Sequence, residues 1–266
     1  MKQRIKWKNV IIALIILICL ITLLISIIKI IKWHKDNKNT EEIIEKIEEI
    51  VEVEEIDPEG DPEEVLPNLY YDYMNVSLIN VDFNELNSIN SDTAGWIKVN
   101  GTKVNYPFVH TNDNEYYLTH SFDKTWNDAG WIFMDYRNNK DLSNKNTILY
   151  GHGRLDRTMF GSMRDIVANG WLNDPSNFVI KISTQYENTL WQVFSVYRIP
   201  TTNDYLRVNF SSDDDFINFT KMLINRSAYN FNTEVSKDDQ MLTLSTCHGK
   251  LDKVVIHAKL IKKEAR

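Results

Sequence analysis

Residues 10–28 form an apolar run without a charged side chain, and this run limits the fold of the chain more than any other feature. A helix that crosses the hydrocarbon core of a bilayer needs about 20 such residues. A cleavable signal peptide has a shorter apolar core and small residues at its cleavage site. Here Ile28 is followed by Lys29-Ile30-Ile31-Lys32, which is not such a site. The run therefore predicts an uncleaved transmembrane anchor.

The charges on both sides of the run predict its orientation. The N-terminal flank carries the denser cluster of basic residues, and the far side turns acidic from Glu41 onward. Positive flanks tend to remain in the cytoplasm, so the rest of the chain is expected outside the cell membrane. This predicts a cytoplasmic basic tail at 1–9, a single-pass anchor at 10–28, an acidic stalk at 29–67 and an extracellular folded domain at 68–266.

The stalk combines many glutamates with apolar residues at helical spacing, Ile43, Ile47, Ile50 and Val51. The Asp-Pro pairs that begin at Asp57 and Asp61 should end such a helix. We interpret this segment as a solvated, self-repelling spacer that holds the domain off the membrane. The net charge of −7 also argues against a nucleic-acid partner, because phosphate binding needs a basic face.

Short segments rich in β-branched and aromatic residues, separated by turn residues, predict a mostly-β barrel or sandwich with peripheral helices. Asn100-Gly101 suits a type I′ hairpin turn. Helices are expected after Asp82, at 159–168, and at 213–225 with Ser212 as the N-cap. The expected strands are 96–99, 102–109, 130–136, 147–150, 178–183, 190–197, 241–246 and 254–261.

The chain has two cysteines, Cys19 and Cys247, and they cannot pair if the apolar run spans a membrane. An unpaired cysteine in an exported domain is either a reactive thiol or a buried, inert side chain. Cys247 ends a predicted strand and precedes turn-like residues, a position where a sulfur can reach solvent. As a nucleophile it would need a base or a cation nearby.

Among six histidines, His152 is favoured as that base, because it also follows a predicted strand, after Gly151. The alternative is a loop histidine without a role. His248 adjoins Cys247 and would point to the opposite face of the strand, and His257 lies mid-strand and is expected to be packed. Neither C-x-x-C nor H-x-x-x-H ligand spacing is found, nor a phosphate-binding loop, so we expect neither a metal nor a cofactor.

Several ordered motifs resemble those of the sortase family. Thr243-Leu244-Ser245-Thr246-Cys247 resembles the sortase nucleophile signature T-L-x-T-C, and its serine is typical of class B. Tyr150-Gly151-His152, followed by Met159-Phe160, resembles the catalytic-histidine segment. The resemblance extends over residues 68–261 through Trp96-Ile97, Gly101-Thr102, Tyr106-Pro107, Asp113-Asn114, Tyr117-Leu118 and Phe133-x-Asp135-Tyr136-Arg137.

The resemblance implies a closed sortase-like β-barrel with Cys247 as nucleophile and His152 as general acid/base. It also implies substrate contacts at Tyr150, Ser245 and Thr246. The family has a catalytic arginine on its last strand, whereas this chain has Lys253 at that position. Lysine is a compact point charge and lacks the planar fork of donors. Either Lys253 substitutes, activity is reduced, or another cation serves, namely Lys250, Arg154 or Arg207.

The implied reaction is acyl transfer by a membrane-anchored cysteine transpeptidase of the Gram-positive cell surface. Such an enzyme cleaves a C-terminal sorting motif of surface proteins after threonine, forms a thioacyl intermediate and transfers the protein to an amine of a peptidoglycan precursor or cross-bridge. The alternatives are a catalytically impaired scaffold that binds peptides, an enzyme biased to hydrolysis, and an unrelated adhesion or sensor ectodomain.

Overall fold

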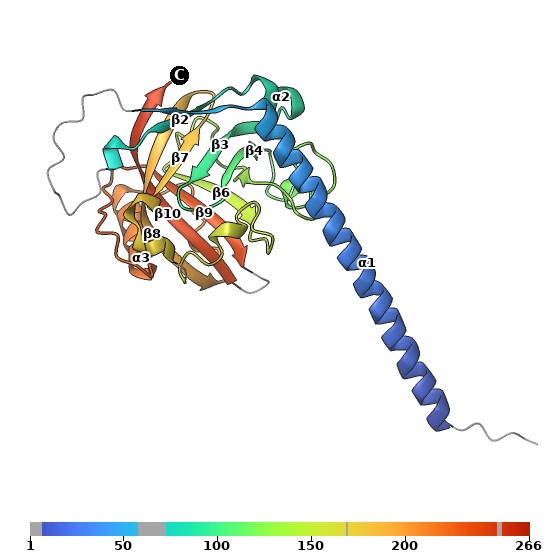
Figure 1. Ribbon diagram of the computed structural model, residues 1–266. Coiled ribbons are helices and arrows are strands. Elements are labelled where there is room, and N and C mark those ends of the chain that lie inside the picture. Colours follow the sequence, from blue (N-terminus) through green and yellow to red (C-terminus); the bar gives the residue numbers. More distant parts are fainter. Residues whose placement is uncertain (1–6, 58–72, 169, 249–251) are drawn as a thin grey trace, which may run out of the picture.

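The computed structural model describes residues 7–57, 73–168, 170–248 and 252–266. They form a long N-terminal helix and a closed eight-stranded barrel (Figure 1). Around the barrel the strands follow the order β10-β8-β7-β3-β4-β5-β6-β9. Their bounds are β3 Thr93–Val99, β4 Asn105–His110, β5 Phe133–Met134, β6 Asn146–His152, β7 Val179–Ser183, β8 Glu187–Pro200, β9 Met241–His248 and β10 Asp252–Ala265. The mostly-β barrel expected from the sequence is confirmed.

Most neighbouring strands of the barrel are antiparallel, but β4 with β5 and β6 with β9 are parallel. The β6–β9 pair joins segments about ninety residues apart in the chain. Because these strands run in the same direction, both end at the same rim of the barrel. The antiparallel partner of β9, strand β10, begins at that rim.

Helix α1 (Trp7–Ile50) is one continuous helix whose first half extends away from the barrel (Figure 1). Its second half packs on the barrel and buries Ile43 and Ile47. Strand β1 (Val53–Ile56) then pairs with β2 (Leu78–Val81) outside the barrel. The interpretation of the stalk as a solvated spacer therefore does not hold for this part, because Ile43, Ile47 and Val51 of its apolar stripe are buried, although Ile50 is exposed. Pro58, Asp61 and Pro62 and the expected domain start near residue 68 lie outside the described residues.

The β3–β4 connection differs from the predicted two-residue turn. The last paired residues are Lys98 and Asn105, so the connection is longer. Thr102 donates its N–H to the Val99 carbonyl at 3.3 Å, and of the two central residues only Gly101 has a positive φ, of 68°. A type I′ turn needs positive φ at both central residues, so the Asn-Gly pair here makes a turn with type II features.

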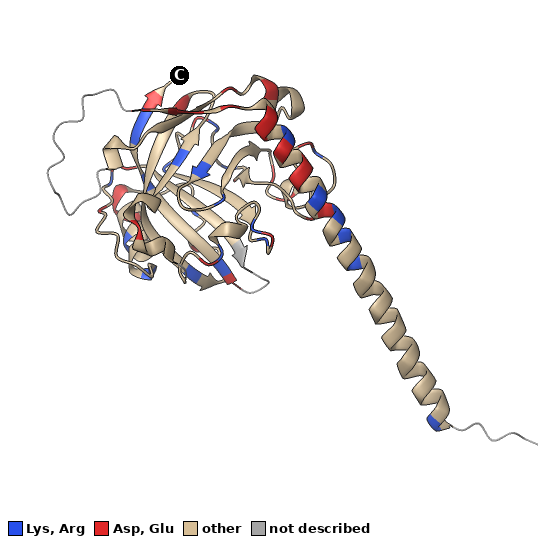
Figure 2. Ribbon diagram, viewed as in Figure 1, with Lys and Arg blue, Asp and Glu red and all other residues tan. Residues whose placement is uncertain are grey.

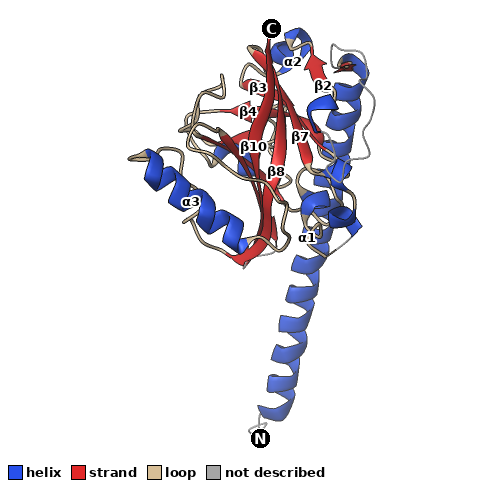
Figure 3. Cartoon of the chain, turned by 90° about the vertical axis from the view of Figure 1, so that its left-hand side faces the viewer, coloured by secondary structure: helices blue, strands red, loops and turns tan. Residues whose placement is uncertain are grey.

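Two of the three expected helices in the folded domain are present. Helix α2 (Asn84–Ile89) follows Asp82, whose carboxylate accepts the Asn84 N–H at 2.9 Å. Helix α3 (Asp213–Arg226) begins at Ser212, whose hydroxyl accepts the Asp215 N–H at 3.1 Å. Helices α3 and α1 lie on opposite sides of the barrel (Figure 3).

The predicted helix at 159–168 is wrong, since this segment forms only the short 3-10 helix η3 (Gly161–Met163) and turns. Met159 has a φ of 52°, which breaks a helical path, and a Cβ at Gly161 would lie 2.4 Å from the Arg154 carbonyl oxygen. The segment therefore folds back against the loop after β6. The other 3-10 helices are η1 Tyr73–Asn75, η2 Tyr116–Leu118, η4 Gly170–Asn173 and η5 Pro175–Asn177.

Candidate active site

A pocket of about 260 Å³ lies at the rim where β6 ends. Strands β5, β6, β9 and β10 supply part of its wall, and the connection after β8, the 3-10 helix η2 and Asn114 before it supply the rest. The lining residues are Asn114, Leu118, Phe133, Tyr150, Gly151, His152, Thr201, Asn203, Tyr205, Leu206, Ser245 and Lys253.

The strand register brings together the three positions that the sequence singled out for chemistry. On the parallel pair β6–β9, the partner of His152 is Cys247. On the antiparallel pair β9–β10, the partner of Cys247 is Lys253. Partner residues on adjacent strands have Cα atoms roughly 5 Å apart. The backbone of Cys247 therefore lies between those of His152 and Lys253, in one row across three strands at the pocket.

The imidazole of His152 is oriented by a backbone carbonyl. Its Nε2 lies 2.8 Å from the oxygen of Leu118, at the end of η2. A carbonyl oxygen only accepts hydrogen bonds, so Nε2 carries a proton. In the neutral ring the proton acceptor is then Nδ1. This contact selects the tautomer that can take up a proton through Nδ1.

Gly130 allows the Leu118 carbonyl and the His152 ring to approach each other. It has a φ of 59°, and a Cβ there would lie 2.9 Å from both Cδ2 of His152 and the oxygen of Leu118. It would lie only 2.5 Å from the carbonyl oxygen of Tyr117. A residue without a side chain is therefore required behind the imidazole, and sequence reasoning assigned no role to this glycine.

Of the four cations considered for the arginine role, Lys253 lines the pocket. Arg154 is paired with Asp156 at 2.6 Å and also donates to Asn37 of α1. Arg207 forms two hydrogen bonds to Asp215, of 3.0 and 2.6 Å. Neither arginine is part of the pocket wall, and Lys250 lies outside the described residues.

The three positions expected to contact substrate do not share one face. Tyr150 and Ser245 line the pocket, and the Ser245 hydroxyl is 2.9 Å from that of Tyr205. Thr246 is fully buried and does not line the pocket. Successive strand residues point to opposite faces, so Thr246 packs behind the wall that Ser245 helps to form.

Asp135 and Arg137 form an ion pair next to Tyr150. Both residues belong to a motif noted in the sequence, but nothing in the sequence assigned them a role. The Tyr150 hydroxyl donates to the buried carboxylate of Asp135 at 2.8 Å. Arg137 donates to both oxygens of the same carboxylate, each at 2.8 Å, and to the Leu206 carbonyl at 3.2 Å. Burial raises the pKa of Asp135, but the hydrogen bonds from Arg137 and Tyr150 outweigh burial and hold this pKa below its ordinary value. The carboxylate thus joins Tyr150 to Arg137 and, through Arg137, to the backbone of Leu206, which also lines the pocket.

His257 is packed, as its mid-strand position predicts. It is fully buried between the hydroxyls of Thr243 and Tyr197, each 2.9 Å from a ring nitrogen. Burial lowers the pKa of His257 to about 3, so it stays neutral. Over the described parts of the chain, His, Cys, Asp and Glu side chains form no group of three or more that could hold a metal ion.

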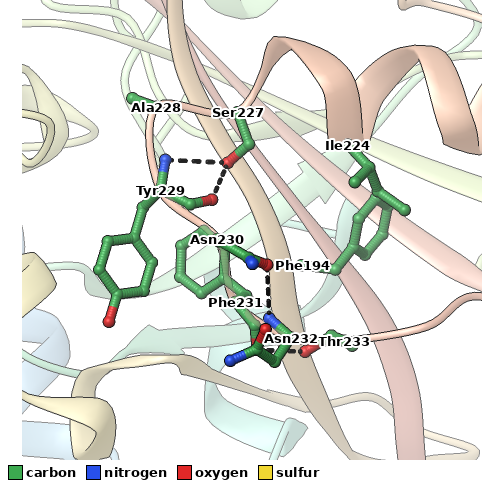
Figure 4. Close-up of a pocket in the computed structure, with 9 residues that line it drawn as sticks. All are labelled: Phe194, Ile224, Ser227, Ala228, Tyr229, Asn230, Phe231, Asn232 and Thr233. Carbon is green, nitrogen blue, oxygen red and sulfur yellow. Dashed lines mark hydrogen bonds between the residues drawn. The ribbon is translucent and has the colours of Figure 1, made fainter.

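A second hollow, of about 320 Å³, lies between β8 and the segment after α3 (Figure 4). Phe194, Tyr229 and Phe231 give it aromatic walls, and Asn230 and Asn232 lie at its edge. None of the residues that the sequence singled out for chemistry lines it. We therefore identify the pocket at His152 as the candidate active site.

The sequence of the barrel is similar to that of known proteins. The family model of the sortase domain matches residues 97–261. Sortase B of Staphylococcus aureus (strain NCTC 8325 / PS 47) is 36% identical over 184 residues, which cover 68% of this chain and 75% of that protein. Sortase B of Listeria monocytogenes serovar 1/2a is 34% identical over 187 residues, with the same coverage of 68% and 75%.

Solved structures agree as well. The crystal structure of a Bacillus anthracis protein similar to sortase B has a TM-score of 0.67 at 34% identity, and covers 88% of this chain and 98% of that one. The Staphylococcus aureus sortase B–substrate complex has a TM-score of 0.63 at 36% identity, and covers 68% and 84%. The chain belongs to the sortase family, in class B, whose members are cysteine transpeptidases.

Proposed function

We propose that this chain is a membrane-anchored transpeptidase of the cell surface. It cleaves the C-terminal sorting motif of surface proteins after threonine and joins the new carboxyl end to an amine of the cell wall. The observation that carries the proposal is the register at the pocket, with the Cys247 backbone between His152 and Lys253. Solved structures of sortase B include a substrate complex from Staphylococcus aureus and a complex with triglycine, which supports a peptide donor and a glycine-type acceptor here.

In the first step, the Cys247 thiolate attacks the threonine carbonyl carbon and forms a C–S bond. The carbonyl oxygen becomes an oxyanion, which the Lys253 ammonium and backbone N–H groups stabilise. As the C–N bond of the scissile peptide breaks, Nδ1 of protonated His152 gives its proton to the leaving amine. Nε2 keeps its hydrogen bond to Leu118 throughout, so the ring does not turn between steps.

In the second step, the acceptor amine attacks the thioester carbonyl, and Nδ1 of His152 takes the proton from the amine nitrogen. The C–S bond breaks, the thiolate leaves and a new amide bond remains. Tyr150 and Ser245 hold the acyl part, because their hydroxyls are fixed by Asp135 and Tyr205 and so present a rigid wall. Water that reaches the thioester instead of the amine gives the hydrolytic side reaction.

Lysine at position 253 motivates a second candidate function, a sortase-like scaffold that binds sorting peptides with little turnover. A lysine offers one point charge where arginine offers two parallel donors. Lys253 nevertheless lines the pocket, which supports the transpeptidase. For the membrane anchor we keep residues 10–28, with 1–9 in the cytoplasm and the barrel outside, because the first half of α1 is apolar and exposed.

The test uses the full chain in detergent micelles. A piece beginning at residue 68 would lack β1 and the isoleucines of α1 that are buried on the barrel. Cleavage of labelled sorting peptides of the Asn-Pro-x-Thr type is measured with and without triglycine, for wild type, Cys247→Ala, His152→Ala, Lys253→Met and Lys253→Arg. We expect the first two variants to abolish cleavage, and Lys253→Met to lower kcat about 100- to 1000-fold, as for one lost oxyanion donor.

The outcomes separate the two candidate functions. Two results together support the transpeptidase. Lys253→Arg still cleaves the peptides, and added triglycine converts the cleaved product into a ligated one. The scaffold is supported if wild type and Lys253→Arg both bind the same peptides without cleaving them. In that case thiol titration must show that Cys247 is free to react. Cleavage that persists in Cys247→Ala would refute the assigned nucleophile.

A further inference from the structure

Two tryptophans bracket the apolar half of α1. Trp7 and Trp33 are 72% and 45% exposed, and each adjoins a lysine, Lys8 and Lys32. They are 26 residues apart (33 − 7), which in a helix spans about 39 Å. A bilayer with its headgroup layers is about 40–45 Å thick, and tryptophan favours those layers. Figure 2 shows an uncharged length of helix between these basic ends. Trp33 therefore marks the outer interface of the membrane through which α1 is proposed to pass.

The barrel touches α1 at this same level. Lys32 is 2.6 Å from the carboxylate of Asp128, and its ammonium lies 6.0 Å from the ring centroid of Trp126. The Trp126 indole N–H also donates to Asp128 at 3.2 Å. Trp126 is 62% exposed although it is among the largest apolar side chains of the chain. An aromatic side chain with a polar tip, held next to the end of the membrane helix, suits the headgroup layer.

Further contacts with α1 fix the position of segment 120–128 along the helix axis. The buried side chain of Asn127 donates to the Asp36 carbonyl at 3.0 Å and to the Thr40 hydroxyl at 3.1 Å. One and two turns further along, Ile43 and Ile47 are buried on the barrel. Helix α1 and segment 120–128 are therefore packed together. Their contact begins at Lys32, next to Trp33, which marks the membrane interface. No length of α1 remains between membrane and barrel to act as a spacer.

We propose that segment 120–128 rests in the outer headgroup layer of the bilayer, with Trp126 inserted among phospholipid headgroups. Lys124 on this segment is paired with Asp92 at 2.9 Å, and Asp123 and Asp128 are acidic, so the contact is carried by the indole of Trp126 and not by charge attraction. The glutamates of α1 all follow Thr40, beyond the contact with segment 120–128, and so lie away from anionic lipids (Figure 2). The inference rests on the proposed membrane anchor, but it is independent of the transpeptidase chemistry.

The lipid contact adjoins the active-site pocket. His120 stacks on Tyr116, with ring centroids 3.9 Å apart, and packs edge-on to Trp126. Tyr116 begins η2, and η2 ends with Leu118, whose carbonyl holds His152. The pocket is thereby held close to the membrane surface, where a lipid-linked acceptor and a membrane-bound donor protein are both concentrated.

The test measures the depth of single nitroxide labels on the full chain in nanodiscs of phosphatidylcholine and phosphatidylglycerol. Cys19→Ala and Cys247→Ala give a background without native thiols and without catalysis. Labels are placed by Trp33→Cys, Trp126→Cys and the control Tyr186→Cys. Tyr186 is similarly exposed, at 54%, and its carbonyl accepts a hydrogen bond from the C-terminal residue, at the end of the barrel far from the membrane helix (Figure 1). Depth is obtained from the ratio of oxygen to nickel-chelate collision rates.

We expect the labels at 33 and 126 to report the headgroup layer and the label at 186 to report water. Labels at 126 and 186 that are equally aqueous, with 33 in the interface, would overturn the proposal while leaving the anchor intact. A label at 33 that is also aqueous would overturn both the anchor and the contact. As a measurement without labels, lipids brominated near the headgroup should quench less fluorescence in Trp126→Phe than in wild type, and equal quenched fractions would contradict the contact.

Discussion

Replacing Gly130 by alanine should impair catalysis because the new methyl group displaces the imidazole of His152. All the proposed catalytic groups remain in this variant. Ordinary van der Waals contact begins at 3.4 Å, and the new Cβ would lie 2.9 Å from Cδ2 of His152. The His152 ring and the Leu118 carbonyl must therefore each retreat by about half an ångström (3.4 − 2.9), and the Tyr117 carbonyl, 2.5 Å from the new Cβ, must move further. A misplacement of about 1 Å costs on the order of 100-fold in rate. We expect kcat/KM to fall roughly tenfold, mostly in kcat.

A matched control separates this effect from backbone strain. Gly130 has a φ of 59°, where a side chain costs about 1–2 kcal/mol. Gly101 has a φ of 68° and also lacks room for a Cβ, but it lies in the β3–β4 connection and does not line the pocket. Gly101→Ala should therefore lower the melting temperature to a similar degree and leave kcat/KM unchanged.

The assay is ligation of a labelled sorting peptide to triglycine by the full chain, at a temperature at which both variants are folded by circular dichroism. The reasoning is refuted if Gly130→Ala stays within twofold of wild type, or if Gly101→Ala loses as much activity as Gly130→Ala.

Three further predictions concern the elements around the barrel. Ile47→Ala should lower the unfolding free energy by about 2–5 kcal/mol in chemical denaturation, because Ile47 is buried between α1 and the barrel, whereas the exposed Ile50→Ala should change it little. Glu55 should make stability depend on pH in acid. Burial disfavours its carboxylate, but hydrogen bonds led by that from Lys181 outweigh burial and lower the pKa of Glu55 from 4.5 to about 2. The stability that the ionised Glu55 adds is complete above about pH 4.5 and is lost as the pH falls toward 2. The melting temperatures of Glu55→Gln and wild type should therefore converge over that range. A constant difference between them would contradict the prediction. Ser212→Ala removes the N-cap of α3 and should cost about 1 kcal/mol, with Ser212→Asp close to wild type in the same melting experiment.

The sequence was sufficient for features that depend on local pattern. The uncharged run at 10–28 predicts a helix long enough to span a membrane, and the described helix has that length. Alternation and β-branched residues located most strands, and Ser212 located the start of α3 because a cap acts within one turn. The T-L-S-T-C motif directed attention to Cys247 before any geometry was known.

Predictions made from local pattern were wrong where distant contacts determine conformation. Residues 159–168 have helix-like composition, but the close packing of Gly161 on Arg154 makes them a folded-back loop. The glutamates of the stalk predicted a solvated spacer, yet Ile43 and Ile47 are buried on the barrel, because a stripe of isoleucines on one helix face is stabilised by any apolar surface it meets.

The sequence by itself determined which residues are candidates for chemistry, since a nucleophile, a base and a cation are recognisable from residue type and their place at strand ends. Only the tertiary structure decided that their backbone positions are neighbours. The parallel β6–β9 pairing joins strands about ninety residues apart, and their register sets His152 beside Cys247. It also decided the tautomer of His152, because the Leu118 carbonyl comes from another segment and reaches the ring only past a glycine. A turn can set the register of a hairpin, but no turn joins β6 to β9, so their pairing is a property of the closed barrel.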